Sequence, residues 1–119
     1  MDYEGHYCVT INRTQYNNQW ILKWDLYDHN ISKLGNNNEF NPDLRYAAFS
    51  TFFNIQQTLE KIKPKFVTFV TNWEQLITDI YTREFTKDYV SYFKELFLPY
   101  NHIVINVFDT EIINEFYNN

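Results

Sequence analysis

The feature that most constrains the fold is a near-continuous apolar run, KFVTFVT, at residues 65–71. Helical patterns flank it on both sides. A strand that is buried on both faces has this composition, and such strands lie inside parallel sheets whose faces are covered by helices. The run therefore predicts a central parallel strand in an α/β domain.

A long helix is predicted immediately before this strand. Asn41 and Pro42 would supply an N-cap and a proline at the first helical position. Apolar residues then recur at spacings of three and four as far as Ile62, and Pro64 prevents the helix from continuing. The apolar stripe is wide, so we expect this helix to be buried on more than one side.

Three antiparallel strands are predicted before the helix. Residues 6–12 (HYCVTIN) and 19–28 (QWILKWDLYD) have strand composition, and Asn17 and Asn18 between them favour a turn. A third, short strand is predicted at residues 29–35, where Gly35 and the following asparagines would end it. The chain after the central strand predicts a helix after Asn72, a helix capped by Thr86, a strand at 102–109 and a short helix at 110–117.

This order of elements resembles the ribonuclease H-like superfamily over essentially the whole chain. The passage FVTFVTNWEQLI resembles the family's sequence of strand, carboxylate and helix. The resemblance implies an α/β fold in one domain, residues 1–119. Its mixed five-stranded sheet would have three antiparallel strands followed by parallel crossovers, with helices on both faces.

The resemblance also implies what the active site should contain. In that family, carboxylates hold two divalent ions that cleave a phosphodiester bond. The corresponding positions of this chain hold Asn12, Arg45 or Tyr46, and Asn72, and only the last segment keeps acids, Asp109 and Glu111. We therefore expect a degenerate site with no catalytic residue, no metal and no cofactor. Two interpretations of Asn72 remain open. It is either a position of the family's site that has lost its carboxylate or a simple helix cap, because it stands three residues before Gln75, as in a variant of the capping box.

Other chemistry lacks its motifs. The two glycines are too few for a phosphate-binding loop or a nucleophile elbow. His6 and His102 would begin strands separated by one neighbour, about 10 Å apart, so a histidine metal site is not expected. Cys8 is the only cysteine and should be a buried thiol. Asp25 and Asp28 should point to opposite faces of a strand as solvated edge charges.

Charge and hydropathy limit the partners. The net charge is −5 and the basic residues are scattered, so direct nucleic-acid binding is not expected. No apolar run approaches the roughly 20 residues of a transmembrane helix, and the first residues do not form a secretory signal. We therefore expect an intracellular, cytoplasmic and soluble protein without membrane contact.

The aromatic content, 20% of the chain, exceeds what a core of this size needs. Tyrosine and tryptophan anchor interfaces because they bury a large area at low entropic cost, although tyrosines lying flat over a small core would explain the same count. The residues that we expect to contact a partner are Trp20, Trp24, Asp25, Tyr27, Asp28, Tyr81 and Tyr92. The partner would be another protein, and a homodimer is a further expectation.

The leading hypothesis is a non-enzymatic protein-binding module. It would be a small acidic inhibitor, of the immunity-protein or phage anti-defence (anti-CRISPR) type, that blocks a basic or nucleic-acid-processing partner. One alternative is a divergent metal-dependent nuclease of the ribonuclease H-like type, built from Asp109, Glu111 and either Asp25 or Asp28. A second alternative is a non-catalytic nucleic-acid-binding module that uses stacking aromatic side chains.

Overall fold

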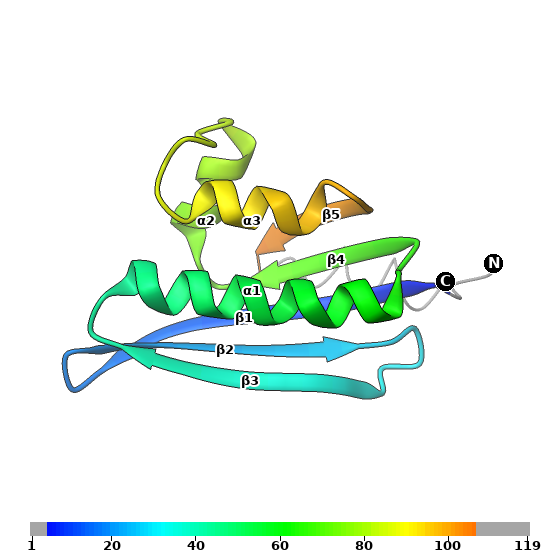
Figure 1. Ribbon diagram of the computed structural model, residues 1–119, viewed down its shortest axis with the longest axis horizontal. Coiled ribbons are helices and arrows are strands. Elements are labelled where there is room, and N and C mark those ends of the chain that lie inside the picture. Colours follow the sequence, from blue (N-terminus) through cyan, green and yellow to red (C-terminus); the bar gives the residue numbers. More distant parts are fainter. Residues whose placement is uncertain (1–4, 107–119) are drawn as a thin grey trace.

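The computed structural model describes residues 5–106 of the chain. The elements in chain order are β1 (His6–Tyr16), β2 (Gln19–Tyr27), β3 (Lys33–Asn41), α1 (Leu44–Ile62), β4 (Phe66–Thr71), α2 (Glu74–Tyr81), α3 (Val90–Phe97) and β5 (Asn101–Asn106). The strands form one sheet in the order β3-β2-β1-β4-β5 (Figure 1). β1, β2 and β3 pair antiparallel, whereas β4 pairs parallel with both β1 and β5. The predicted α/β fold with a mixed five-stranded sheet is therefore confirmed.

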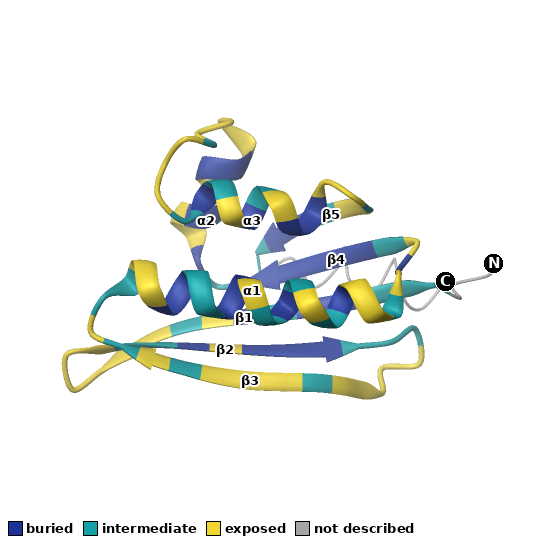
Figure 2. Ribbon diagram, in the orientation of Figure 1, coloured by how far each residue is buried: buried dark blue, intermediate teal, exposed yellow. Residues whose placement is uncertain are grey.

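The three helices that the structure describes pack on one face of this sheet. Their buried side chains share a single core with Val9 and Ile11 of β1, Trp24 of β2 and Phe69 of β4. Figure 2 shows most of β4 in the colour of buried residues. The opposite face carries a second, smaller cluster centred on Cys8, Val70 and Ile105. Cys8 is buried there, as predicted. The helix predicted at 110–117 lies outside the described residues.

Helix α1 begins two residues later than predicted. Asp43, not Asn41, is the N-cap, and its carboxylate accepts a hydrogen bond from the Arg45 N–H at 2.9 Å. Asn41 is the last residue of β3, where it pairs with Trp20, and its side chain accepts from the Asp43 N–H at 2.8 Å. The helix ends before Pro64 as predicted, with Lys63 in the left-handed conformation.

The third antiparallel strand is present as predicted, but its predicted bounds, 29–35, were wrong. β3 spans Lys33–Asn41, so the asparagine run 36–38 lies inside the strand instead of ending it. Residues 29–32 form a turn in which Asp28 accepts hydrogen bonds from the N–H groups of Asn30 and Ser32, both at 2.9 Å. The asparagines have low strand propensity, but the long ladder with β2 overrides that preference.

Three other boundaries also differ from the predictions. β1 continues to Tyr16, because its ladder with β2 runs the full length of the hairpin. Helix α3 starts at Val90 and not near Thr86, since Asp88 has a positive φ of 21° that interrupts the helix. β5 begins at Asn101, and the predicted residues 107–109 of that strand lie outside the described part of the chain.

No helix within residues 5–106 is long and apolar enough to cross a membrane.

Candidate functional site

The carboxyl ends of β1 and β4 meet at one edge of the sheet. The parallel register runs from His6 opposite Phe66 to Ile11 opposite Thr71, so the next residues along each strand, Asn12 and Asn72, come side by side. Open α/β sheets bind ligands beyond the carboxyl ends of their strands. The first candidate site is therefore this edge, and we call it the β1/β4 edge.

Asn72 bridges the two strands at the β1/β4 edge. Its Oδ1 accepts from the Arg13 N–H at 2.7 Å, and its Nδ2 donates to the Arg13 carbonyl at 2.9 Å and to Asn12 Oδ1 at 2.7 Å. The side-chain amide thus supplies both a donor and an acceptor, as a backbone peptide group would. All these groups are satisfied within the protein.

The prediction that Asn72 caps the following helix was wrong. Trp73 is the N-cap residue of α2, and no side chain caps that helix by a hydrogen bond. The Trp73 N–H instead donates to Thr71 Oγ1 at 3.1 Å. Asn72 is turned back toward β1 because the paired strands end there and leave the N–H and carbonyl of Arg13 as its neighbours.

The side chain of Arg13 lies on the helix-covered face of the sheet, whereas Asn12, its neighbour on the strand, lines the opposite face. The guanidinium carbon of Arg13 is 4.9 Å from the ring centroid of Trp20 and 5.3 Å from that of Trp73, both within cation–π range. Trp73 is fully buried and packs against Tyr89 with ring centroids 4.9 Å apart. Burial raises the pKa of Tyr89 and the negative charge of Asp79 adds to this, while the Arg13 charge opposes it.

The contact between Arg13 and Trp20 was not predicted, although a signal was present in the sequence. Gln15 is directly opposite Trp20 in the hairpin register, which makes Arg13 a diagonal neighbour of Trp20 across the two strands. Diagonal positions lie within reach of long and aromatic side chains. The turn at Asn17 and Asn18 fixes this register, so the contact could have been inferred from the sequence.

The structure brings together two of the predicted degenerate-site residues, Asn12 and Asn72. Arg45 forms an exposed ion pair with Asp43 at 2.9 Å, and among the described residues no hydrogen bond or ion pair joins it to the asparagines. Hydrogen bonding to Arg45 holds the pKa of Asp43 below its usual range. Asp109 and Glu111 lie outside the described residues.

Behind the asparagines, on the face opposite the helices, is a hollow of about 360 Å³. It is lined by Thr10, Ile11, Asn12, Lys23, Asp25, Val70, Thr71 and Asn72. Asp25 is buried there, which corrects the prediction of a solvated edge charge. Its Oδ1 forms an ion pair with Lys33 Nζ at 3.3 Å, and its Oδ2 accepts a long hydrogen bond from Thr10 Oγ1 at 3.5 Å. The ion pair explains how a carboxylate is tolerated at this depth.

The carboxylates predicted for a divergent nuclease do not assemble within the described chain. Asp28 belongs to the turn after β2, where backbone N–H groups occupy its carboxylate, while Asp25 lies in the hollow and is paired with Lys33. No group of three or more histidine, cysteine, aspartate or glutamate side chains within residues 5–106 could hold a metal ion.

The predicted partner-contacting aromatics divide into three classes. Trp24 is only 4% exposed and belongs to the core, so it cannot meet a partner and that prediction was wrong. Trp20 and Tyr27 are half-buried. Tyr81 and Tyr92 are exposed, although the Tyr81 hydroxyl already donates to the Val104 carbonyl. Helical spacing predicted that Phe53 would widen the buried stripe of α1, but it is exposed. Tyr46, which was considered only as a position of the degenerate site, is exposed as well.

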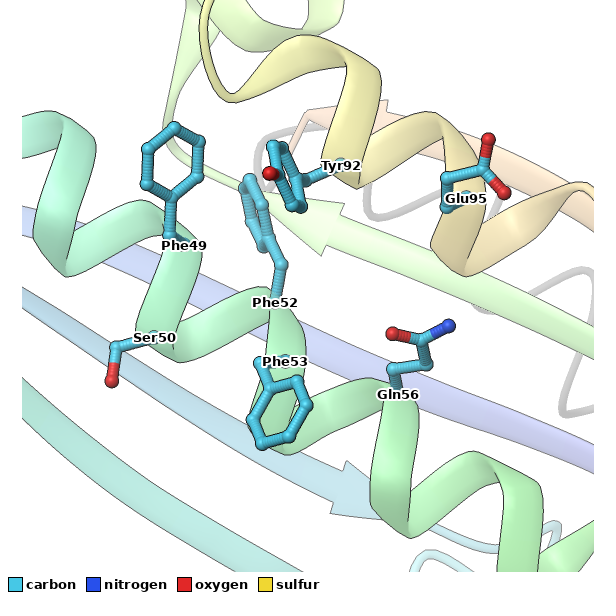
Figure 3. A pocket seen from close by; sticks show the side chains of 7 residues that line it. All are labelled: Phe49, Ser50, Phe52, Phe53, Gln56, Tyr92 and Glu95. Atoms are coloured by element: carbon cyan, nitrogen blue, oxygen red, sulfur yellow. The ribbon is translucent and has the colours of Figure 1, made fainter.

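A second candidate site is an apolar groove between α1 and α3. Its volume is about 480 Å³, and Phe49, Ser50, Phe52, Phe53, Gln56, Tyr92 and Glu95 line it (Figure 3). Phe49 and Tyr92 pack against each other with centroids 4.6 Å apart. Figure 3 shows Phe52 pointing toward this pair, whereas Phe53 lies on the outer side of α1. We call these residues the α1/α3 groove.

Comparison with known proteins supports the fold and no more. No protein-family model matches the sequence, and no curated protein matches it. Among solved structures, a ribonuclease H1 from the halophilic archaeon Halobacterium salinarum NRC-1 is similar, with a TM-score of 0.65, 10% identity, and coverage of 95% of this chain and 92% of that one.

Two further solved structures share the arrangement. LC11-RNase H1 in complex with an RNA/DNA hybrid has a TM-score of 0.57 at 12% identity, covering 94% of each chain. The Argonaute of Marinitoga piezophila in complex with a 5' OH guide RNA has a TM-score of 0.60 at 12% identity, over 88% of this chain and 16% of that one. Element order, sheet topology and these three similarities agree: the chain has a ribonuclease H-like fold.

Proposed function

We propose that this chain is a non-enzymatic ribonuclease H-like domain that acts by binding another protein. The partner is a basic, nucleic-acid-processing protein, and binding inhibits it. The observation that carries the first part is the interlocked pair Asn12–Asn72, hydrogen-bonded to the backbone of Arg13, at the edge where the fold would hold metal-binding carboxylates.

The electrostatics of the β1/β4 edge support a loss of catalysis. Cleavage by two divalent ions needs several carboxylates that offset the charge of the metals. The amides of Asn12 and Asn72 are neutral, and their polar atoms are already engaged with each other and with the backbone of Arg13. An edge with this composition favours a structural role over metal binding.

The α1/α3 groove supports binding to a protein. Phe53 and Tyr92 are each 57% exposed and Tyr46 is 62% exposed, so several large rings meet solvent on neighbouring helices. Contiguous exposed apolar surface of this kind marks interaction sites. Glu95 lines the groove, and the chain carries a net charge of −5. An acidic protein with an aromatic groove suits a partner whose apolar anchor is flanked by lysine or arginine.

Two measurements test the proposal together. The purified chain is incubated with RNA–DNA hybrid, RNA and DNA in Mg²⁺ or Mn²⁺, and we expect no cleavage. In parallel, proteins captured by the wild type are compared with those captured by Phe53→Ala and Tyr92→Ala. The matched control is Tyr16→Ala, which removes an aromatic ring that is 69% exposed, in β1 and outside the α1/α3 groove.

The expected result is one stoichiometric partner that both groove variants lose and the control retains. Its nucleic-acid-processing activity should fall when the wild-type chain is added, and its binding should weaken with salt. Cleavage of any substrate by the purified chain would contradict the non-enzymatic part. A partner retained by both groove variants would contradict the assignment of the groove.

A second function is favoured by a separate observation, the stacking of Arg13 between Trp20 and Trp73 at the β1/β4 edge. Cations and aromatic rings together bind single-stranded nucleic acid without catalysis. This alternative predicts salt-dependent retardation of RNA or DNA that Trp20→Ala and Arg13→Ala abolish. Absence of any retardation at low salt would remove it.

A further inference from the structure

The two edge strands of the described sheet differ in what lies beside them. At one end, α2 packs beside β5, and the Tyr81 hydroxyl donates to the Val104 carbonyl of that strand. At the other end is β3, with nine residues, and no described element lies beyond it (Figure 1). A long unpaired edge offers a row of N–H and C=O groups to another strand.

The charged side chains that could protect this edge instead form contacts with other residues of the same chain. Edge strands are usually blunted by proline, by charged side chains that project outward or by a β-bulge. β3 has one irregularity, at its start, where the register with β2 shifts between Leu26 and Tyr27 and leaves Leu34 without a partner residue in β2. Lys33 instead pairs with Asp25, and its ammonium lies 5.9 Å from the ring centroid of Tyr27. Glu39 accepts a hydrogen bond from Asn54 of α1 at 3.1 Å. The only acidic and only basic side chains of β3, Glu39 and Lys33, are therefore both paired with other residues of the same chain.

The orientation of the β3 backbone follows from one short contact. The Asn38 N–H donates to the side chain of Asn37 at 2.8 Å, so this N–H points away from β2. Alternate residues of a strand direct their backbone groups to the same side, and the N–H and C=O groups of Asn36 and Phe40 therefore also point outward. At the centre of this edge, the side chain of Asn37 accepts the outward-pointing N–H of Asn38.

We propose that the β3 edge binds a second copy of this chain, in antiparallel orientation, with a two-fold axis at Asn37. In this register Asn36 lies opposite Asn38 of the other copy, and the two outward-facing residues form a hydrogen-bonded pair. Leu34 lies opposite Phe40 at both ends. These are the two exposed large apolar residues of β3, at 49% and 58% exposure.

The sequence of β3 favours a second copy of this chain, and not an unrelated strand, as the partner of this edge. Its central part reads LGNNNEF, in which Leu34 and Phe40 stand at equal distances from Asn37. A two-fold interface requires a surface that complements itself, and this spacing satisfies that condition. Glu39 lies opposite Gly35, and Lys33 lies beyond the register shift at Leu34, so no like charges face each other. The pairing joins two five-stranded sheets into one continuous sheet.

Charge substitutions at Asn37 test the axis, because this residue would face itself. The molar mass of the wild type is measured by sedimentation equilibrium across a concentration series, and we expect a monomer–dimer equilibrium. Asn37→Glu and Asn37→Lys each place two like charges at the axis, and each should weaken self-association about tenfold or more. Mixing the two variants should restore dimers, because opposite charges then meet.

A disulfide test reports the same geometry at low affinity. Residues facing each other in a non-hydrogen-bonded antiparallel pair have Cβ atoms about 4.5–5.5 Å apart, close to the span of a disulfide. Asn37→Cys should therefore cross-link under mild oxidation, while the native Cys8 is buried and should not react. Gln15→Cys, exposed in β1, is the matched control.

Both tests measure self-association of this chain alone, so their outcomes do not depend on the proposed function or on a second protein. Dimers that the single charge variants lose and the mixture regains support the two-fold pairing. A wild-type chain that stays monomeric, with no faster cross-linking of Asn37→Cys than of Gln15→Cys, overturns it. Dimers that survive both charge variants place the interface elsewhere and also overturn it.

Discussion

The side chain of Asn72 pairs with both the N–H and the carbonyl of Arg13, and so extends the β1–β4 ladder by one step beyond Thr71. A carboxylate has nearly the same shape but cannot donate. The amide at this position is therefore explained by the local structure itself. An aspartate there would meet the carbonyl of Arg13 and Asn12 Oδ1 as unpaired acceptors.

Asn72→Asp should consequently destabilise the fold at neutral pH. It removes two donated hydrogen bonds and sets a negative charge against two oxygens, which should cost about 1–3 kcal/mol. Because the charge is disfavoured in the folded state, the folded pKa of the introduced carboxyl group lies above its usual value of about 4. The deficit should therefore shrink as the pH falls toward about 4 and be smallest below it, where the protonated carboxyl group regains one donor. Urea unfolding of wild type and variant at pH 7 and pH 4 gives both values, and a variant equal to wild type at pH 7 would refute this account.

Arg13→Ala should reduce stability by about 1–2 kcal/mol. Each cation–π contact contributes about 0.5–1 kcal/mol, and the aliphatic stem of the side chain also covers the tryptophan rings. Arg13→Lys should recover only part of the loss, since lysine lacks the planar group that stacks between two rings. Lys61→Ala, at an exposed site on α1, is the control and should change little. Chemical unfolding followed by tryptophan fluorescence measures the differences.

The start of α1 gives a direct comparison of two candidate caps. Asp43→Ala should destabilise the protein by about 0.5–2 kcal/mol, because it leaves the Arg45 N–H without its side-chain acceptor. Asn41→Ala should cost less, since Asn41 accepts only from the Asp43 N–H in the connection before the helix. Thermal unfolding of both variants ranks them. The reverse order would restore Asn41 as the functional cap.

Alkaline pH should weaken the fold through Tyr89. Burial raises the pKa of this phenol, so the folded state binds its proton more tightly than the unfolded chain does. The stabilisation is complete below the unfolded pKa of about 10 and is lost as the pH rises through the folded pKa. Unfolding free energies between pH 9 and pH 11.5 should therefore decline, and less steeply in Tyr89→Phe. Parallel curves for the two proteins would contradict the prediction.

The sequence predicted the order of elements because burial leaves strong periodic signals. The apolar run of β4 and the stripe of α1 made the central βα unit visible. The sequence did not predict the bounds of β3, because three consecutive asparagines are typical of a loop and form a strand here only by pairing with β2. The two failures at the β1/β4 edge, Asn72 as a cap and Asp25 as a solvated charge, have one cause. Both depend on contacts between strands far apart in the chain, which local spacing does not encode.

Divalent metal should not stabilise this chain if the β1/β4 edge has lost its metal-binding role. A site with a dissociation constant of about 1 mM would add about 1.4 kcal/mol to the unfolding free energy at 10 mM Mg²⁺, because binding to the folded state alone shifts the equilibrium. We expect no change in the unfolding midpoint with Mg²⁺ or Mn²⁺, relative to EDTA at matched ionic strength. The full chain is used, so that Asp109 and Glu111 are included. A midpoint that rises with metal concentration and falls back in Asp109→Asn would show that acidic residues still hold a cation, and the non-enzymatic proposal would then be wrong.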